Sequence, residues 1–216
     1  MSINFGLYDI FASIVPGLLY SFLIGETLKL LGLQSIDLID VDTFGQSAVV
    51  VIVSLLLGNL AGGFTYKYWY RILYRKDTSI LALQRIREIH PNVKFQFNNF
   101  DGDILFSVIA HHNIQLAEKI ERNKVTGIML QKISFAVFLF GILQIITFVS
   151  GHSLINLGSS LLALLLSRMS LTRAGTMERW YYQDIFREAL NYGNNLREIL
   201  SASKQITSRR MNKRGI

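Results

Sequence analysis

Three long stretches of the chain carry no charged side chain, and this uneven placement of charge is the strongest constraint on the fold. They run from Ile10 to Gly25, from Ala48 to Tyr66, and from Ile133 to Ser167, where His152 is the only titratable side chain. About 20 apolar residues suffice for a helix to cross a bilayer. Half of the residues are apolar and only 17% are charged, whereas about a quarter are charged in soluble domains. The sequence therefore predicts an integral membrane protein.

The third stretch is too long for one span. As one helix it would be about 52 Å long, against a hydrocarbon core of about 30 Å. The small polar sequence "SGHS" at Ser150–Ser153 divides it in two, and Pro16 should kink the first span. We therefore expect an all-α membrane protein with four transmembrane helices in two hairpins. Hairpin 1 covers residues 10–66, with spans at about 10–31 and 45–66, and hairpin 2 covers 133–168, with spans at about 133–149 and 154–168.

Lysine and arginine are confined to two segments of the chain. Of the 22 Lys and Arg residues, all except Lys29 lie in residues 67–132 or from Arg168 onward. Basic residues gather on the cytoplasmic side of membrane proteins. This distribution predicts a multi-pass membrane protein with both termini in the cytoplasm. It also explains most of the net charge of +7 without nucleic acid.

Aromatic and basic residues alternate from Tyr66 to Lys76. Such a pattern is found on surfaces that bind single-stranded nucleic acid and at the interface between a membrane and the cytoplasm. Because this stretch directly follows a predicted span, the topology favours the membrane interface. A ligand-binding role for part of it stays open.

The two cytoplasmic segments are expected to be mostly helical. In residues 67–132, a helical pattern follows Thr78, and "VKFQFNNF" alternates as a short strand or β-hairpin would. From Asp103 the pattern continues as one long helix into the third span. Residues 169–216 comprise a C-terminal helix and a basic tail.

Sequence motifs for catalysis are lacking. There is no phosphate loop, no dinucleotide fingerprint and no nucleophile elbow. The adjacent His111 and His112 point about 100° apart on a helix, so they do not favour a metal site. We therefore expect neither an enzyme nor a cofactor or metal. Asp9 borders the first span and needs a partner such as Lys132 or Arg168, or water.

Polar and small residues within the spans suggest pore-lining and helix-packing positions. The pore or gate candidates are Asn59, Gln144, Thr147 and Asn156. Small residues recur every fourth position, which allows close helix approach. The helix-packing candidates are Ser54, Gly58 and Gly62 in the second span, and Ser159 and Ala163 in the fourth. Either stripe could join helices within one chain or join subunits.

Two stretches resemble small bacterial membrane effectors of anti-phage defence. They are "LYDIFASIVPGLLY" at Leu7–Tyr20 and "AEKIERNKVTGIMLQKISF" at Ala117–Phe135. The nearest comparison is the membrane effector of two-gene systems such as Hailong, in which a nucleotidyltransferase makes an oligonucleotide that opens an oligomeric channel. The resemblance implies a homo-oligomeric, signal-gated pore that disrupts the inner membrane.

We therefore form two hypotheses. The first is a homo-oligomeric channel in the lipid bilayer, gated by an anionic nucleotide or oligonucleotide or by a cytoplasmic sensor protein. The ligand-binding candidates are Arg85, Arg87, Lys94, Lys119, Arg122 and Lys124. The alternative is a non-conducting membrane scaffold or anchor that holds a soluble partner protein.

Overall fold

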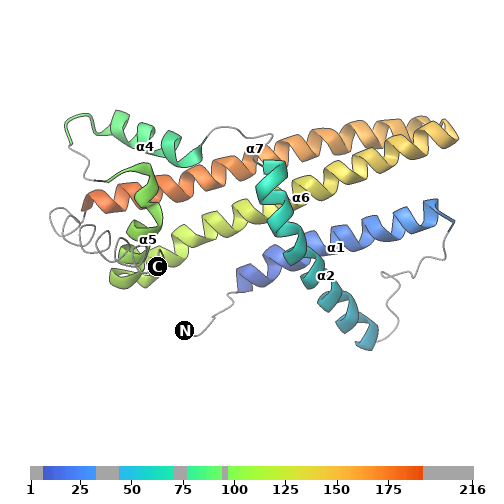
Figure 1. Cartoon of the computed structure of the whole chain (residues 1–216), viewed down its shortest axis with the longest axis horizontal. Coiled ribbons are helices and arrows are strands. Elements are labelled where there is room, and N and C mark those ends of the chain that lie inside the picture. Colours follow the sequence, from blue (N-terminus) through green and yellow to red (C-terminus); the bar gives the residue numbers. More distant parts are fainter. Residues whose placement is uncertain (1–6, 33–43, 71–76, 94–96, 192–216) are drawn as a thin grey trace, which may run out of the picture. The chain divides into compact units, whose positions relative to one another are not determined.

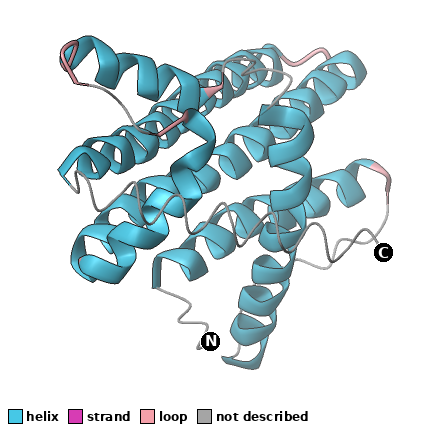
Figure 2. Cartoon of the chain, turned by 60° about the vertical axis from the view of Figure 1, so that its left-hand side comes forward, coloured by secondary structure: helices cyan, strands magenta, loops and turns pink. Residues whose placement is uncertain are grey.

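The computed structural model describes residues 7–32, 44–70, 77–93 and 97–191, and every regular element within them is a helix (Figures 1 and 2). The all-α prediction is confirmed for these residues. Of the expected short strand, Val93 and Phe97 lie in no regular element, while Lys94, Phe95 and Gln96 lie outside the described residues. The chain forms two compact units: unit 1 comprises Met1–Arg75 and Val125–Met177, and unit 2 comprises Lys76–Lys124 and Glu178–Ile216.

Unit 1 begins with two apolar helices. Helix α1 covers Leu7–Leu30 and includes Pro16, while α2 covers Phe44–Phe64 without a single charged residue. A π-helical turn, η1 (Thr65–Tyr70), directly follows α2. Trp69 of this turn packs against the Phe138 ring of α6, with 4.4 Å between ring centroids, and its indole N–H donates to Ser134 Oγ at 3.2 Å. This residue of the aromatic and basic stretch is therefore part of the packing within unit 1.

The helices α1 and α2 approach each other closely at two glycines. A Cβ atom on Gly17 would overlap the backbone of Ser54, and one on Gly58 would overlap the backbone of Ser13. Only glycine permits this distance between the backbones. Beside the crossing, Ser13 Oγ donates a 2.8 Å hydrogen bond to Asn59 Oδ1. Small residues thus set the geometry of this helix pair.

Two long helices follow, and each contributes residues to both units. Helix α6 covers Ile114–Gly151 and α7 covers Leu154–Asn191. The break between them falls at His152, whose positive φ of 51° ends the helical path. The predicted break at "SGHS" coincides with this position.

The expected long helix from Asp103 into the third span is interrupted once. Helix α5 covers Gly102–His112, and Asn113 adopts an extended conformation between α5 and α6. Its side chain accepts a 3.1 Å hydrogen bond from the backbone N–H of Leu116, as an N-cap residue does. Asparagine competes with the helix for backbone hydrogen bonds, so the helix restarts here.

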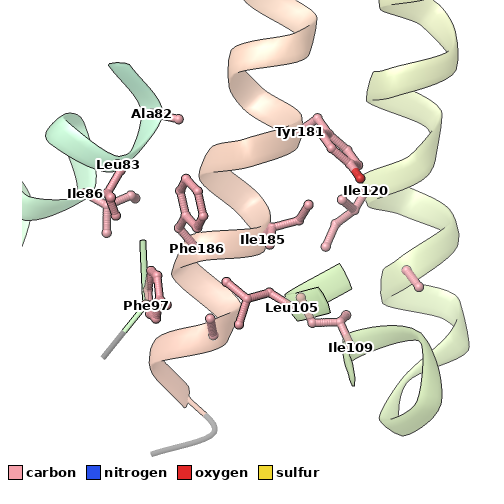
Figure 3. Packing of buried hydrophobic residues seen from close by; sticks show 12 residues of the cluster. Ala82, Leu83, Ile86, Phe97, Leu105, Ile109, Ile120, Tyr181, Ile185 and Phe186 are labelled. Atoms are coloured by element: carbon pink, nitrogen blue, oxygen red, sulfur yellow. The ribbon is translucent and has the colours of Figure 1, made fainter. Parts of the chain in front are cut away.

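Unit 2 has its own apolar core, shown in Figure 3. Helix α4 (Thr78–Ile89) is capped by Asp77, which accepts from the Ser79 N–H at 3.0 Å, and a short 3₁₀ turn, η2 (Asn99–Asp101), precedes α5. These elements pack with the unit 2 portions of α6 and α7. The fully buried side chains at the centre include Ile86, Leu105, Ile109, Ile120, Tyr181, Ile185 and Phe186.

Four helices are long and apolar enough to cross a membrane, namely α1, α2, α6 and α7. Many of their large apolar side chains face outward, including Leu60, which is 76% exposed, and Ile155, which is 81% exposed. Such surfaces are unfavourable in water and suit hydrocarbon. The structure is therefore compatible with a multi-pass membrane protein.

Candidate functional site

Of the four pore or gate candidates, Gln144 and Thr147 lie on α6 and Asn156 lies on α7, and Gln144 makes a hydrogen bond across the two helices. Ser159 Oγ donates to the Gln144 side-chain oxygen at 3.3 Å and to the Asn156 carbonyl at 2.9 Å. Thr147, one turn beyond Gln144, donates to the Leu143 carbonyl of its own helix at 2.7 Å. The side chains of Gln144, Thr147, Asn156 and Ser159 are half-buried. Polar atoms here are shared between two neighbouring helices.

Asn59 lies elsewhere, on α2. Its exposed side chain accepts the hydrogen bond from Ser13 of α1. The structure therefore does not join Asn59 with Gln144, Thr147 and Asn156 in one cluster within the chain.

The small-residue stripes face neighbouring helices of the same chain. Ser54 and Gly58 are buried against α1, and a Cβ on Gly62 would lie 3.0 Å from the Lys132 side chain. Ala163 of α7 is buried opposite Gly141 of α6. Of the two alternatives for these stripes, the geometry favours contacts within one chain.

Lys132, which the sequence offered only as a candidate partner of Asp9, is buried in unit 1. Lys132 is 5% exposed, and its ammonium donates to the Ala12 carbonyl of α1 at 3.4 Å, a long hydrogen bond. Its own carbonyl accepts from the Tyr20 hydroxyl at 3.0 Å. None of the ion pairs found among the described residues involves Lys132, and the side chain of its candidate partner Asp9 lies outside them.

Next to this lysine, α6 and α7 exchange two buried hydrogen bonds. Ser134 Oγ donates to the Ser167 carbonyl at 2.8 Å, and Ser167 Oγ donates to the Ser134 carbonyl at 2.9 Å. Sequence reasoning did not pair these two serines, because a serine in an apolar run gives no signal of its partner.

The ligand-binding candidates form two separate groups in unit 2. Arg85 and Arg87 are exposed on α4, and Lys119, Arg122 and Lys124 are exposed on α6. Figure 3 shows the core side chains of α4 and α6 on opposite sides of α7. Arg85 pairs with Glu88 at 3.2 Å, and Lys94 lies outside the described residues. The described candidates therefore do not make one continuous basic surface.

The group on α6 borders a half-buried carboxylate of α7. Asp184 accepts from the Asn123 amide at 3.3 Å and pairs with Arg187 at 3.7 Å. Burial raises the pKa of Asp184, and the charges of Arg187 and Lys119 partly oppose this effect. The ammonium of Lys124 lies 5.1 Å from the centre of the Tyr181 ring, a cation–π distance.

Within the described residues, no cluster of three or more His, Cys, Asp or Glu side chains could hold a metal ion. In comparisons with known proteins, no family model matches the sequence, and neither a curated protein nor a solved structure shows significant similarity to it.

Proposed function

We propose that the protein is a homo-oligomeric channel of the bacterial inner membrane, gated by an anionic nucleotide or oligonucleotide and acting in anti-phage defence by disrupting that membrane. The defence role is suggested only by the resemblance of two sequence stretches. The physical support is the continuity of α6 and α7, since each helix is unbroken from the core of unit 2 into the apolar part of unit 1.

The ligand site is assigned to the basic group on α6. Lys119, Arg122 and Lys124 lie on the helix that also carries Gln144 and Thr147. Binding energy gained there acts directly on a helix with pore candidates, whereas Arg85 and Arg87 lie on α4, which ends at Ile89. A ligand shifts a gate only by its differential affinity for the two states. The α6 group is therefore the better place for a gating ligand.

The water path is expected between subunits. The small residues on α1 and α2 pack against each other within one chain. A single chain therefore has no lumen at that crossing. Gln144, Thr147 and Asn156 are the proposed gate residues, because they are half-buried polar side chains on otherwise apolar stretches of α6 and α7. Asn59, exposed on α2, is a second lining position.

The mass of the protein in nanodiscs and ion flux from liposomes test this proposal together. The proposal expects a ring of three or more 24.6 kDa chains and flux triggered by ATP or short oligonucleotides. Arg122→Gln with Lys124→Gln should abolish the triggered flux without changing the mass. The matched control, Arg85→Gln with Arg87→Gln, removes equal charge from α4 and should retain flux. A single chain, or equal flux in both variants, would contradict the proposal.

A second candidate function is a membrane scaffold for a soluble partner. It is favoured by Phe100 on the η2 turn, which is 85% exposed, and by Ile114, which is 68% exposed. The turn that carries Phe100 is closed by a hydrogen bond from the Asn98 N–H to the Asp101 carboxylate at 2.9 Å. The scaffold predicts no conductance under any ligand, together with partner recruitment that Phe100→Ser abolishes.

A further inference from the structure

An apolar groove lies in unit 1 between α1, α2 and α6. Its cavity volume is about 520 Å³, and all its lining residues except Tyr20 and Thr27 are aliphatic. Leu23 and Tyr20 are buried at its floor, while Leu60 and Ile146 are exposed at its rim. The groove therefore opens toward the surroundings of the helices.

The two hydroxyl groups of the groove are already engaged. Tyr20 donates to the Lys132 carbonyl at 3.0 Å, and Thr27 donates to the Leu23 carbonyl at 2.7 Å. A polar ligand would lose hydrogen bonds to water without gaining new donors here. The lining therefore favours an apolar occupant and does not suit a water path.

The extent of the groove matches one leaflet of a bilayer. Its lining on α1 runs from Tyr20 to Leu28, a rise of about 12 Å, and half of a hydrocarbon core is about 15 Å. Just beyond this end, Lys29 pairs with Glu26 at 3.3 Å. Charged side chains belong at headgroup depth, so the groove extends from there toward the bilayer centre.

We propose that this groove binds one acyl chain of a phospholipid. A helix of a second copy fits less well, since about 12 Å of a helix 10 Å wide fills on the order of 900 Å³. An unbranched chain is narrow enough to reach the buried floor at Leu23. This inference rests on insertion of the four helices, which belongs to the proposed function, but not on conduction or gating.

The test uses the full chain in nanodiscs that contain a phosphatidylethanolamine with a diazirine in the middle of one acyl chain. After photolysis, labelled peptides are mapped by mass spectrometry at rising probe fraction. Labelling of the groove residues Leu57, Ala61 and Leu143 should saturate. Labelling near Leu165 of α7, which is 58% exposed to the surroundings, should rise linearly and reports insertion by itself.

Ala61→Phe fills the groove and should lower its labelling on the order of tenfold, since a few methylenes lose their contacts. Leu165→Phe is the matched control and should change nothing in the groove. Leu143→Ala enlarges the groove and should not reduce its labelling. This second variant tests the proposal even if Ala61→Phe fails to fold. The proposal would be overturned if labelling of the groove residues rose linearly with probe fraction and was unchanged by Ala61→Phe. Crosslinks between chains at the groove would also overturn it. Absence of labelling at Leu165 would instead contradict membrane insertion.

Discussion

At the residue scale, two glycines determine how closely α1 and α2 approach. The backbone of Ser13 fills the space beside Gly58, and the backbone of Ser54 fills the space beside Gly17. Backbone atoms cannot rotate away as a side chain can, so an added methyl group must separate the helices. Separation would also lengthen the hydrogen bond from Ser13 to Asn59.

Gly58→Ala should therefore destabilise the protein by about 1–3 kcal/mol, the usual cost of overpacking. The measurement is the unfolding temperature in nanodiscs. Gly63→Ala is the matched control, because nothing lies within 4 Å of the added Cβ. It should be neutral or stabilise by about 0.5–1 kcal/mol through helix propensity. Equal effects of the two substitutions would show that α1 and α2 do not cross as described.

Asp184 should make the stability of the folded protein depend on pH with a sign opposite to that of most carboxylates. Burial raises its folded-state pKa above the usual 3.8, so folding favours the protonated form. Its contribution to stability is complete below the unfolded-state pKa and is lost as the pH rises through the folded-state pKa. Lys119, Arg187 and Glu188 are the charged groups that act on it.

Asp184→Asn should therefore slow hydrogen exchange along the unit 2 portion of α7 at neutral pH. The amide oxygen can still accept from Asn123, whereas the buried charge is gone. The advantage over the wild-type chain should shrink as the pH falls below the folded-state pKa. Arg187→Gln removes a positive charge that stabilises the Asp184 carboxylate, so it should accelerate hydrogen exchange at neutral pH. Faster exchange in Asp184→Asn would mean that its pairing with Arg187 outweighs burial.

At the element scale, reciprocal serine hydrogen bonds join α6 to α7. Ser134 and Ser167 are both buried, and each donates to the carbonyl of the other. Within a membrane, such bonds have measured couplings that average about 0.6 kcal/mol, with a maximum near 1.7 kcal/mol. Because two hydrogen bonds act together here, the coupling energy between Ser134 and Ser167 should lie above that average.

A double-mutant cycle with Ser134→Ala and Ser167→Ala should give a coupling of about 1 kcal/mol. Stability would be measured by unfolding in mixed detergent micelles. A control cycle pairs Ser134→Ala with Thr147→Ala, whose hydroxyl bonds its own helix. That cycle should be additive within about 0.3–0.5 kcal/mol. Additivity in the first cycle would contradict the contact between the two helices.

The helices were far more predictable from sequence than their contacts. Charge-free runs predicted four apolar helices, and the small residues around His152 predicted the break between α6 and α7, since a span length and a helix breaker are local properties. The restart at Asn113 was missed because the apolar pattern continues on both sides of it. The burial of Lys132 was also missed, because it depends on Gly62 and Ala12 of two other helices.

For the candidate sites too, the sequence predicted properties of single helices but not the contacts between helices. Small residues at fourth positions suggested close packing, but only the structure places Ser54 and Gly58 against α1 of the same chain. The basic residues suggested one ligand site, yet those that the structure describes lie on two helices, α4 and α6, whose core side chains lie on opposite sides of α7 (Figure 3). Sequence spacing reports which residues share a helix face. It does not report how separate helices are arranged.

At the scale of the whole molecule, two unbroken helices, α6 and α7, each contribute residues to both units. Unit 2 contains the ligand candidates and unit 1 contains the gate candidates, and the boundary crosses α6 at Lys124–Val125 and α7 at Met177–Glu178. An interruption of the backbone hydrogen bonds kinks an α-helix. Gating through these helices is therefore sensitive to a local break placed between the proposed ligand site and the proposed gate.

Thr126→Pro should remove ligand-triggered flux while preserving assembly. Proline at this position deletes the backbone donor, clashes with the preceding turn, and costs about 3 kcal/mol or more within a helix. Thr126→Ala is the control, because it removes the same side chain and retains the helix. Met177→Pro places an equivalent break in α7. Mass in nanodiscs and hydrogen exchange in both units would verify folding, and liposome flux would report the gate. Triggered flux equal to wild type in a folded Thr126→Pro ring would show that α6 does not transmit the signal, and the same result for Met177→Pro would exclude α7.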